Sequence, residues 1–420
     1  MTVVRGETPL ESSAPRPRAS ILAPLRYRDY RLLWSGLIVS NLGTWMQLTT
    51  LGYLVVKLAG SAKAASLDVG ILGASSAVPV VLLSPLAGVV ADRYPRRRVL
   101  FVTNGLEVCF ALTLAILTST HHIALWEIFI IAGMRSTGQS FDAPARQSWV
   151  PLLVPRENLG NAIGLNSVAF NAPSIIGPPL AGFLILGVGI ATSFYVNAVA
   201  TLAVVVALIF MRPVGPSSTV RENVLDSILA GMRFLAGHRV LRSVLLLLVL
   251  NCLLVRPYSQ LMPAYAAHVV HVNAQGLGFL LAASGAGAIA GSVFTALIGT
   301  RRRGLIWFAS AAAMACGTIV LGSVHVFAIS FGVLVFIGFA VLSFAGNSNV
   351  LLQTLSPDDM RGRAISVFSM IILGIIPAGS LLLGSLASFI GLPGALIAGG
   401  AVAIILAVAV FIENPLLRAV

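Results

Sequence analysis

The chain has 420 residues, of which 57% are hydrophobic and only 10% are charged, and it carries a net charge of +13. Soluble domains average about 25% charged residues, so this chain lacks the polar surface that water requires and is expected to use a lipid bilayer as its solvent. The positive charge falls in short segments between apolar runs, which argues against a nucleic-acid-binding surface.

Residues 1–30 are rich in arginine and proline and contain no apolar core, so they predict a cytoplasmic tail rather than a cleavable signal peptide. The apolar runs that follow are about 20 residues long, which favours helices over the shorter, alternating strands of a barrel. Twelve membrane-spanning helices are expected, at 32–56, 69–91, 99–120, 124–146, 160–186, 190–211, 241–264, 276–299, 305–322, 327–351, 364–388 and 392–412.

The charges of the connecting segments alternate along the chain. With the two tails, every second connection holds arginines, 23 in all, whereas the remaining connections hold the two lysines Lys57 and Lys63. Because cationic residues are retained on the cytoplasmic side of a membrane, we expect both termini in the cytoplasm.

The longest connection divides the spans into six and six. The sequence predicts a tail at 1–30, a six-helix half at 31–211, a cytoplasmic linker at 212–240, a second half at 241–412 and a short tail at 413–420. Apolar residues at helical spacing in the linker indicate an amphipathic helix on the inner leaflet. Docking of a soluble partner is the alternative for this helix.

An internal repeat relates the two halves. The fifth predicted span matches the eleventh at a constant offset of 202 residues, which pairs Gly177 with Gly379 and Gly182 with Gly384. Parallel repeats of six helices are typical of secondary transporters. The expected fold class is therefore an all-α membrane protein, with twelve transmembrane helices in two six-helix pseudo-repeats.

Few ionisable residues lie inside the predicted spans, where each costs about 2.5–3.5 kcal/mol to insert. Glu107 is a candidate for exchanging a proton, and Arg135 can hold an anionic group or act on a nearby carboxylate. The alternatives are a glutamate that reaches interfacial water and an ion pair that only fixes helix packing. Asp142 lies seven residues after Arg135, on nearly the same helical face, where it can pair with an arginine of the adjacent basic turn.

Polar side chains in the first, seventh and tenth spans predict the lining of a central cavity for a substrate. A lipid-facing helix does not need such groups, although hydrogen bonding between packed helices is an alternative explanation. The candidates are Asn41, Trp45, Gln47, Arg256 and Asn347.

Two pairs of histidines, 121–122 and 268/271, fall on connections between spans without cysteine or acidic companions, so no metal site is expected. The sequence contains neither the phosphate-binding pattern Gly-x-x-x-x-Gly-Lys-Ser/Thr nor a hydrolase motif. We therefore expect no cofactor and no enzymatic activity.

The turn at residues 88–97 reads Gly-x-x-x-Asp-Arg-x-x-Arg-Arg between two apolar runs, and it resembles the signature turn of major facilitator transporters. Pro95 replaces the glycine usual in that turn, and Gln139 replaces the glycine that usually follows the buried arginine matched by Arg135. The resemblance implies proton coupling near Arg135 and a charge network that switches during alternating access. That switch comprises Gly88, Asp92, Arg93, Arg96 and Arg97, with Asp142 on the neighbouring span.

The fifth span is similar to the Gly-Pro-rich segment of drug–proton antiporters, and the resemblance assigns helix packing to Gly177, Pro178 and Gly182. Residues 30–34 and 144–147 resemble the branch that contains the enterobactin exporter and the macrolide and tetracycline efflux proteins.

The resemblance implies a monomeric, multi-pass protein of the bacterial cytoplasmic membrane that exports a small amphipathic molecule, a drug-like compound or a siderophore, in exchange for protons. The alternatives are a facilitator or importer of a nutrient or lipid, and a non-transporting membrane receptor on the same scaffold.

Overall fold

The computed structural model describes residues 22–212, 224–298 and 303–414, and its regular elements there are helices. The first half comprises α1 (Arg28–Leu58), α2 (Ala62–Arg93), α3 (Arg96–Ser119), α4 (Leu125–Trp149), α5 (Leu159–Gly187) and α6 (Ile190–Phe210). The second half comprises α8 (Arg239–Leu254), α9 (Tyr258–His268), α10 (Ala274–Leu297), α11 (Arg303–Ser323), α12 (Phe327–Leu355) and α13 (Asp358–Glu413), and α7 (Val224–Gly237) precedes it. Short 3₁₀ turns occupy Ala23–Arg26, Val150–Leu152 and Arg156–Asn158.

The expected twelve spans are present, with two differences in how the helices are divided. The seventh span is interrupted at residues 255–257, which separate α8 from α9. The last two spans run together in α13, where the chain reverses at Gly391 with φ 80°, a conformation that glycine adopts without steric cost.

Nine stretches of the described chain are long and apolar enough to cross a bilayer, and α13 counts once among them although it holds two spans. The helices α1 and α4 are not among the nine because polar side chains interrupt their apolar sequence. These two helices supply several of the residues considered below, so their lower hydropathy reflects polar groups inside the bundle.

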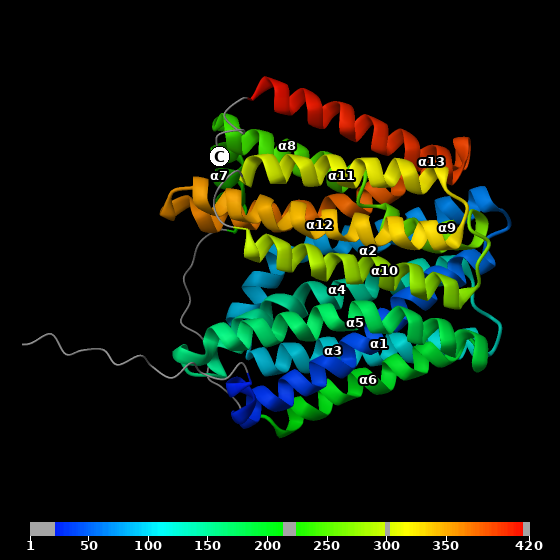
Figure 1. The fold of residues 1–420 in the computed structure, drawn as a ribbon. Coiled ribbons are helices and arrows are strands. Elements are labelled where there is room, and N and C mark those ends of the chain that lie inside the picture. Colours follow the sequence, from blue (N-terminus) through cyan, green and yellow to red (C-terminus); the bar gives the residue numbers. More distant parts are fainter. Residues whose placement is uncertain (1–21, 213–223, 299–302, 415–420) are drawn as a thin grey trace, which may run out of the picture.

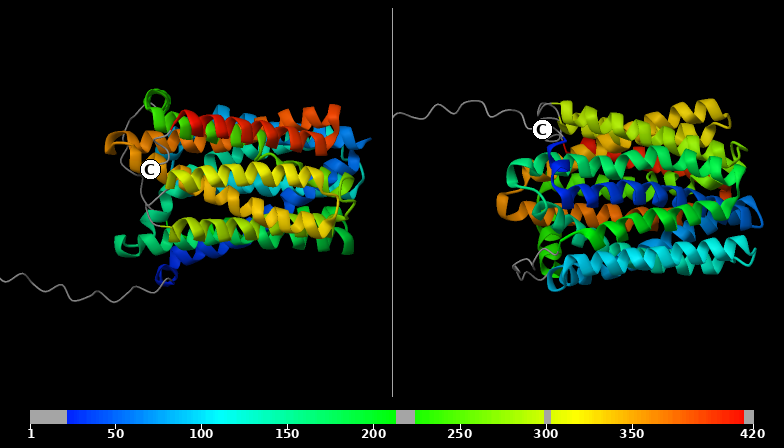
Figure 2. Two further views of the ribbon diagram at one scale, coloured as in Figure 1. Left: turned by 45° about the horizontal axis from the view of Figure 1, so that its top comes forward. Right: turned by 90° about the horizontal axis from the view of Figure 1, so that it is seen from below.

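The spanning helices lie side by side along one direction, as the ribbon and its two further views show (Figures 1 and 2). We call one end of the bundle the histidine end, with the connections at 59–61, 120–124, 269–273 and 324–326. The opposite end, with the connections at 94–95 and 150–158, is the arginine end. The helix expected in the linker is present as α7 at the arginine end, where Gly231 packs against the backbone of Arg363 in α13. Residues 213–223 of that linker lie outside the described chain.

The offset of 202 residues appears in space as a repeated set of helix contacts. A side chain at Gly177 would collide with α1, and one at Gly379 would collide with the end of α8. In the same way, Gly182 packs on the start of α10 and Gly384 packs on the start of α2. Each half thus holds one helix against its own first span and against the opposite half, with the same spacing of five residues between the two contacts.

The two halves meet closely at the histidine end. A Cβ atom at Gly384 would lie 2.6 Å from the carbonyl oxygen of Ser66, and one at Gly278 would lie 2.5 Å from that of Pro178. Toward the arginine end of the same helices, Gly160 in α5 and Gly362 in α13 have no atom within 4 Å of such a position. We call the α2–α13 and α5–α10 contacts at the histidine end the seam.

Two clusters of buried side chains hold the bundle together. A smaller cluster lies at the arginine end of the first half, where the buried Tyr30 hydroxyl donates to the carbonyl of Ala162 at 2.8 Å. The larger cluster is centred on the second half, where the fully buried Trp307 donates its indole N–H to Ser348 Oγ at 2.8 Å. The buried polar groups of both aromatic side chains are therefore satisfied.

Candidate functional site

The two ionisable residues singled out in the third and fourth spans form one ion pair. Arg135 Nε donates to Glu107 Oε1 at 2.6 Å, and only 6% and 12% of the two side chains are exposed. The helices α3 and α4 bring them together because α4 packs along α3 within the first half. Both residues stand out in the sequence, but their pairing does not.

Two uncharged amides extend this ion pair across the first half. The Asn197 Nδ2 group of α6 lies 2.7 Å from Gln47 Oε1 of α1 and 3.5 Å from Glu107 Oε1. The side chains of both amides are fully buried. Asn197 is not among the predicted site residues, although an asparagine inside the apolar run Ile190–Phe210 is a polar interruption of the same kind as those in α1.

This buried site holds more hydrogen-bond donors than it satisfies. Arg135 Nη2 and Gln47 Nε2 are buried and have no hydrogen-bond partner among the described atoms. Buried polar groups nearly always find a partner, so these donors favour an additional acceptor at the site, such as water or an oxygen of a transported molecule. Protonation of Glu107 would raise the demand further, because a neutral carboxyl is a weaker acceptor for Arg135.

Among the described side chains, Asp142 pairs with a residue of its own helix. Its carboxylate accepts from Arg146 Nη1 at 2.6 Å, one helical turn along α4, and from Asn104 Nδ2 of α3 at 2.9 Å. The expected partner was an arginine of the turn between α2 and α3, and no such pair is found among the described side chains. An i,i+4 partner is closer in space than a side chain that has to cross from another helix.

The basic turn itself is only partly described. Arg97 donates from Nε to the carbonyl of Leu208 at 2.7 Å and from Nη2 to that of Ile209 at 2.9 Å, so it caps the last turn of α6. Arg96 is buried. The side chains of the other predicted switch residues, Gly88, Asp92 and Arg93, lie outside the described residues.

Two of the five cavity candidates are buried in the packed interior instead. Gln47 and Asn347 are fully buried, so the expectation that they line a cavity is wrong for this conformation. Asn347 donates to Ser343 O in its own helix, and Gln47 accepts from α6 as described above. Helical periodicity places a polar group on a face, but the neighbouring helix decides whether that face is open.

The other three candidates are less enclosed. Asn41 donates across to the carbonyl of Ala169 in α5 at 3.0 Å, and Trp45 beside Gly177 is 36% exposed. Arg256 is partly buried within the interruption between α8 and α9, next to Pro257.

A cavity of about 520 Å³, widely open to its surroundings, lies near the arginine end of the second half. Its walls come from α10, α12 and the first part of α13, and Arg303 contributes from the start of α11. Polar groups at Thr295 and Asn349 face apolar ones at Phe368 and Ile372 in this lining. Such an arrangement suits an amphipathic molecule.

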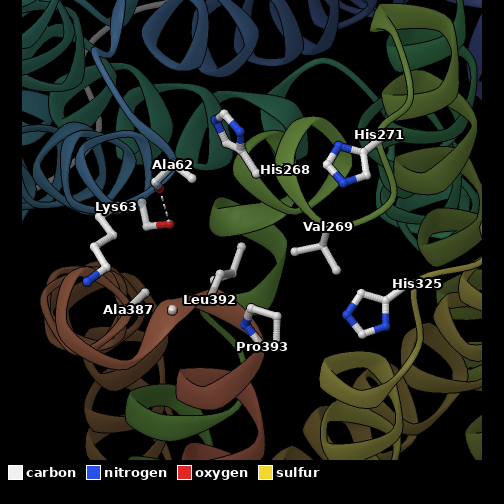
Figure 3. Close-up of a pocket in the computed structure, with 11 residues that line it drawn as sticks. Ala62, Lys63, His268, Val269, His271, His325, Ala387, Leu392 and Pro393 are labelled. Atoms are coloured by element: carbon white, nitrogen blue, oxygen red, sulfur yellow. Dashed lines mark hydrogen bonds between the residues drawn. The ribbon is translucent and has the colours of Figure 1, made fainter.

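A second, smaller cavity of about 180 Å³ lies at the seam (Figure 3). Lys63 contributes from α2 of the first half, and His268, His271 and His325 contribute from the second. The lining contains no carboxylate. Within the described part of the chain, no group of three or more histidine, cysteine or acidic side chains is arranged to hold a metal ion.

Acidification is expected to loosen the seam. Free histidine gains its proton near pH 6.5, and each proton bound here adds positive charge beside Lys63 with no lining carboxylate to balance it. The closed seam should therefore lose stability relative to an open one when these histidines gain protons. A spin-label distance between Gly60→Cys and Val326→Cys measures this opening, in a protein whose native cysteines are replaced.

Replacing the three pocket histidines by glutamine should remove this part of the pH response. A matched control is His238→Gln, since His238 is exposed at the start of α8 and far from the seam in sequence and in the fold. An unchanged response in the triple variant would contradict the expectation.

Known transport proteins of bacteria resemble this chain in sequence. The profile of a family described as transmembrane secretion effector matches residues 19–419. The chain is 26% identical to the multidrug efflux pump Tap of Mycolicibacterium fortuitum, over 84% of this chain and 88% of that protein. It is 28% identical to the enterobactin exporter EntS of Citrobacter koseri, over 66% and 67% of the two chains.

Solved structures resemble it in fold. The nucleoside transporter NupG superimposes with a TM-score of 0.69 at 14% identity and covers 91% of this chain and 99% of its own. A D-xylose–proton symporter superimposes with a TM-score of 0.71 at 15% identity, covering 92% and 97%. Identities this low carry the fold alone.

Proposed function

Since this chain belongs to the transmembrane secretion effector family of the major facilitator superfamily, and is thus a multi-pass secondary transporter of small molecules and not an enzyme, we propose that it exports an amphipathic molecule in exchange for protons. The observation that carries the proposal is the buried ion pair between Glu107 and Arg135. Protonation of Glu107 would leave Arg135 without its anionic partner inside the membrane, so the charge of this carboxyl group would decide whether Arg135 stays engaged.

Competition at this pair would couple the two fluxes. With Glu107 charged, the pair is neutral and Arg135 is engaged. With Glu107 protonated, the site carries one net positive charge and favours a conformation in which water satisfies Arg135. Proton and substrate would then stabilise different states, so a proton gradient would drive the cycle by shifting populations.

The similarity to an efflux pump and to a siderophore exporter supports export as the direction. Under the positive-inside rule the arginine end faces the cytoplasm, so both termini and the linker lie there. The 520 Å³ cavity near that end would then receive substrate from the cytoplasm while the seam stays shut. Rocking of the halves 31–211 and 241–412 would open the seam and release the substrate. We place the transporter, as a monomer, in the bacterial cytoplasmic membrane, in keeping with relatives from bacteria.

The test is transport by the purified protein in liposomes with an imposed pH gradient. Hydrophobic cations, macrolides and catecholate siderophores are offered in turn, and substrate and proton fluxes are recorded together. We expect substrate to move against the direction of proton flow for at least one class. Substrate flux without proton flux would contradict the antiport, and would instead favour a facilitator.

A further inference from the structure

We propose that the buried amides Gln47 and Asn197 transmit protonation of Glu107 to the contact between the two halves. The inference rests on the proposed role of Glu107 as proton site. It assigns a coupling role to two uncharged residues that do not themselves bind the proton.

Asn197 lies between two hydrogen-bond acceptors. Its single Nδ2 group faces two acceptors, Gln47 Oε1 at 2.7 Å and Glu107 Oε1 at 3.5 Å. An amide nitrogen has two hydrogens, so it can serve both acceptors at once. The side chain therefore links α3, α6 and α1 through hydrogen bonds that depend on the charge of one carboxylate.

The helices α1 and α6 approach each other closely where these amides meet. A Cβ atom at Gly43 would lie 2.7 Å from Asn197 Oδ1 and 2.8 Å from the Cβ atom of Ala200. Thr201 donates to the same Oδ1 atom at 3.5 Å and so fixes the orientation of the amide. The rotation of Asn197 is thus restricted, and a change at Glu107 must be met by movement of α1 or α6.

Further along, α1 contacts the other half of the protein. Gly52 lies five residues beyond Gln47, about one and a half turns further along the helix and on another face. A Cβ atom there would lie 2.6 Å from Cγ of Pro263 in α9. Movement of α1 at Gln47 would therefore be felt at a tight contact with the second half.

Proton binding changes the hydrogen bonds at the start of this chain of contacts. The charged carboxylate attracts both Arg135 and Asn197, whereas the neutral acid is a weaker acceptor for each. Asn197 would then bond to Gln47 alone, and α1 and α6 would relax away from α3. We expect this rearrangement to favour the state with the seam open.

Two measurements separate coupling from proton binding. The carboxyl band of Glu107 in infrared spectra, identified by its loss in Glu107→Gln, reports protonation. The distance between labels at Gly60→Cys and Val326→Cys reports seam opening. Both are recorded against pH in full-length protein that carries glutamine at His268, His271 and His325, so that the seam itself does not titrate.

In Asn197→Leu the carboxyl band should still titrate, while the pH-dependent change in the opening equilibrium should shrink about tenfold, within the range usual for coupling between sites. Gln47→Leu provides a second variant if Asn197→Leu does not fold. The matched control is Asn251→Leu, because Asn251 is as buried but donates only to Leu247 O of its own helix. This control should leave both measurements unchanged.

The remaining outcomes are distinct. A seam that responds fully in Asn197→Leu and Gln47→Leu would overturn the coupling role. Loss of the titrating band together with the seam response would also overturn it, because the amides would then act on proton binding alone. A seam response that persists in Glu107→Gln would instead count against Glu107 as the proton site.

Discussion

Replacing Glu107 by glutamine is expected to abolish transport driven by a pH gradient. Glutamine has the same shape but cannot exchange a proton, so the pair with Arg135 would carry a permanent positive charge, as in the protonated state. We expect the gradient-driven flux to fall by at least about 100-fold, the usual cost of losing an essential proton-transfer group. Exchange of labelled for unlabelled substrate without a gradient should persist, since it needs no proton.

A nearby glutamate provides the control for this variant. Glu127 accepts from the backbone N–H of Ala124 at 2.9 Å and caps α4 at the histidine end. Glu127→Gln should retain the flux and cost about 1 kcal/mol of stability at most. Full gradient-driven flux in Glu107→Gln would show that the proton binds elsewhere.

Removal of the other partner should lower the stability of the fold as well as disturb coupling. Arg135→Ala leaves the Glu107 carboxylate buried without its cation, and breaking a buried pair in this way costs about 3–5 kcal/mol. The double variant Glu107→Gln/Arg135→Ala should recover most of that loss. Thermal unfolding of Glu107→Gln, Arg135→Ala and the double variant in detergent measures these differences in stability.

Replacing Gly278 by leucine is expected to hold the seam open. A Cβ atom there would lie 2.5 Å from the carbonyl oxygen of Pro178 in the opposite half, and neither backbone can move without separating the halves. Overpacking of this kind costs about 1–3 kcal/mol, which favours the open state by about fivefold to 150-fold. The distance between labels at residues 60 and 326 should therefore lengthen at neutral pH.

Two further glycines separate this effect from damage to a helix. Gly332 of α12 has no atom within 4 Å of a Cβ position, so Gly332→Leu should leave the label distance unchanged. A side chain at Gly287 would overlap the carbonyl oxygen of Val335 within the second half, so Gly287→Leu should reduce folded yield instead of opening the seam. An unaltered distance in Gly278→Leu would mean that the seam is not the moving contact.

The helices were largely predictable because a bilayer places a simple demand on the chain. Each span must be apolar over about 20 residues and must satisfy its own backbone, so composition and length are enough to locate it. The prediction was less complete at the boundaries. The last two spans are continuous in α13, which depends on the backbone conformation of Gly391. The break before α9 depends on local geometry near Pro257.

The candidate site was predictable only in its members. A charged residue inside an apolar run is visible in any sequence, and Glu107 and Arg135 were found in that way. Their pairing was not visible, because the rotation of α3 relative to α4 is set by side chains along the whole contact. Asn197 was missed for a related reason, since an uncharged amide in an apolar helix gains its meaning from the groups that it faces.

By itself, the sequence of this protein predicted twelve membrane-spanning helices, which the structure confirms, and it predicted two related halves with arginine-rich connections on one side. Hydropathy, charge and an internal repeat are properties of the chain, and they do not depend on how the helices pack. Only the tertiary structure decided that Glu107 meets Arg135, that Gln47 and Asn347 are enclosed, and that the halves close at the histidine end. Those features depend on contacts between residues far apart in the chain, where a few ångströms of helix rotation decide the outcome.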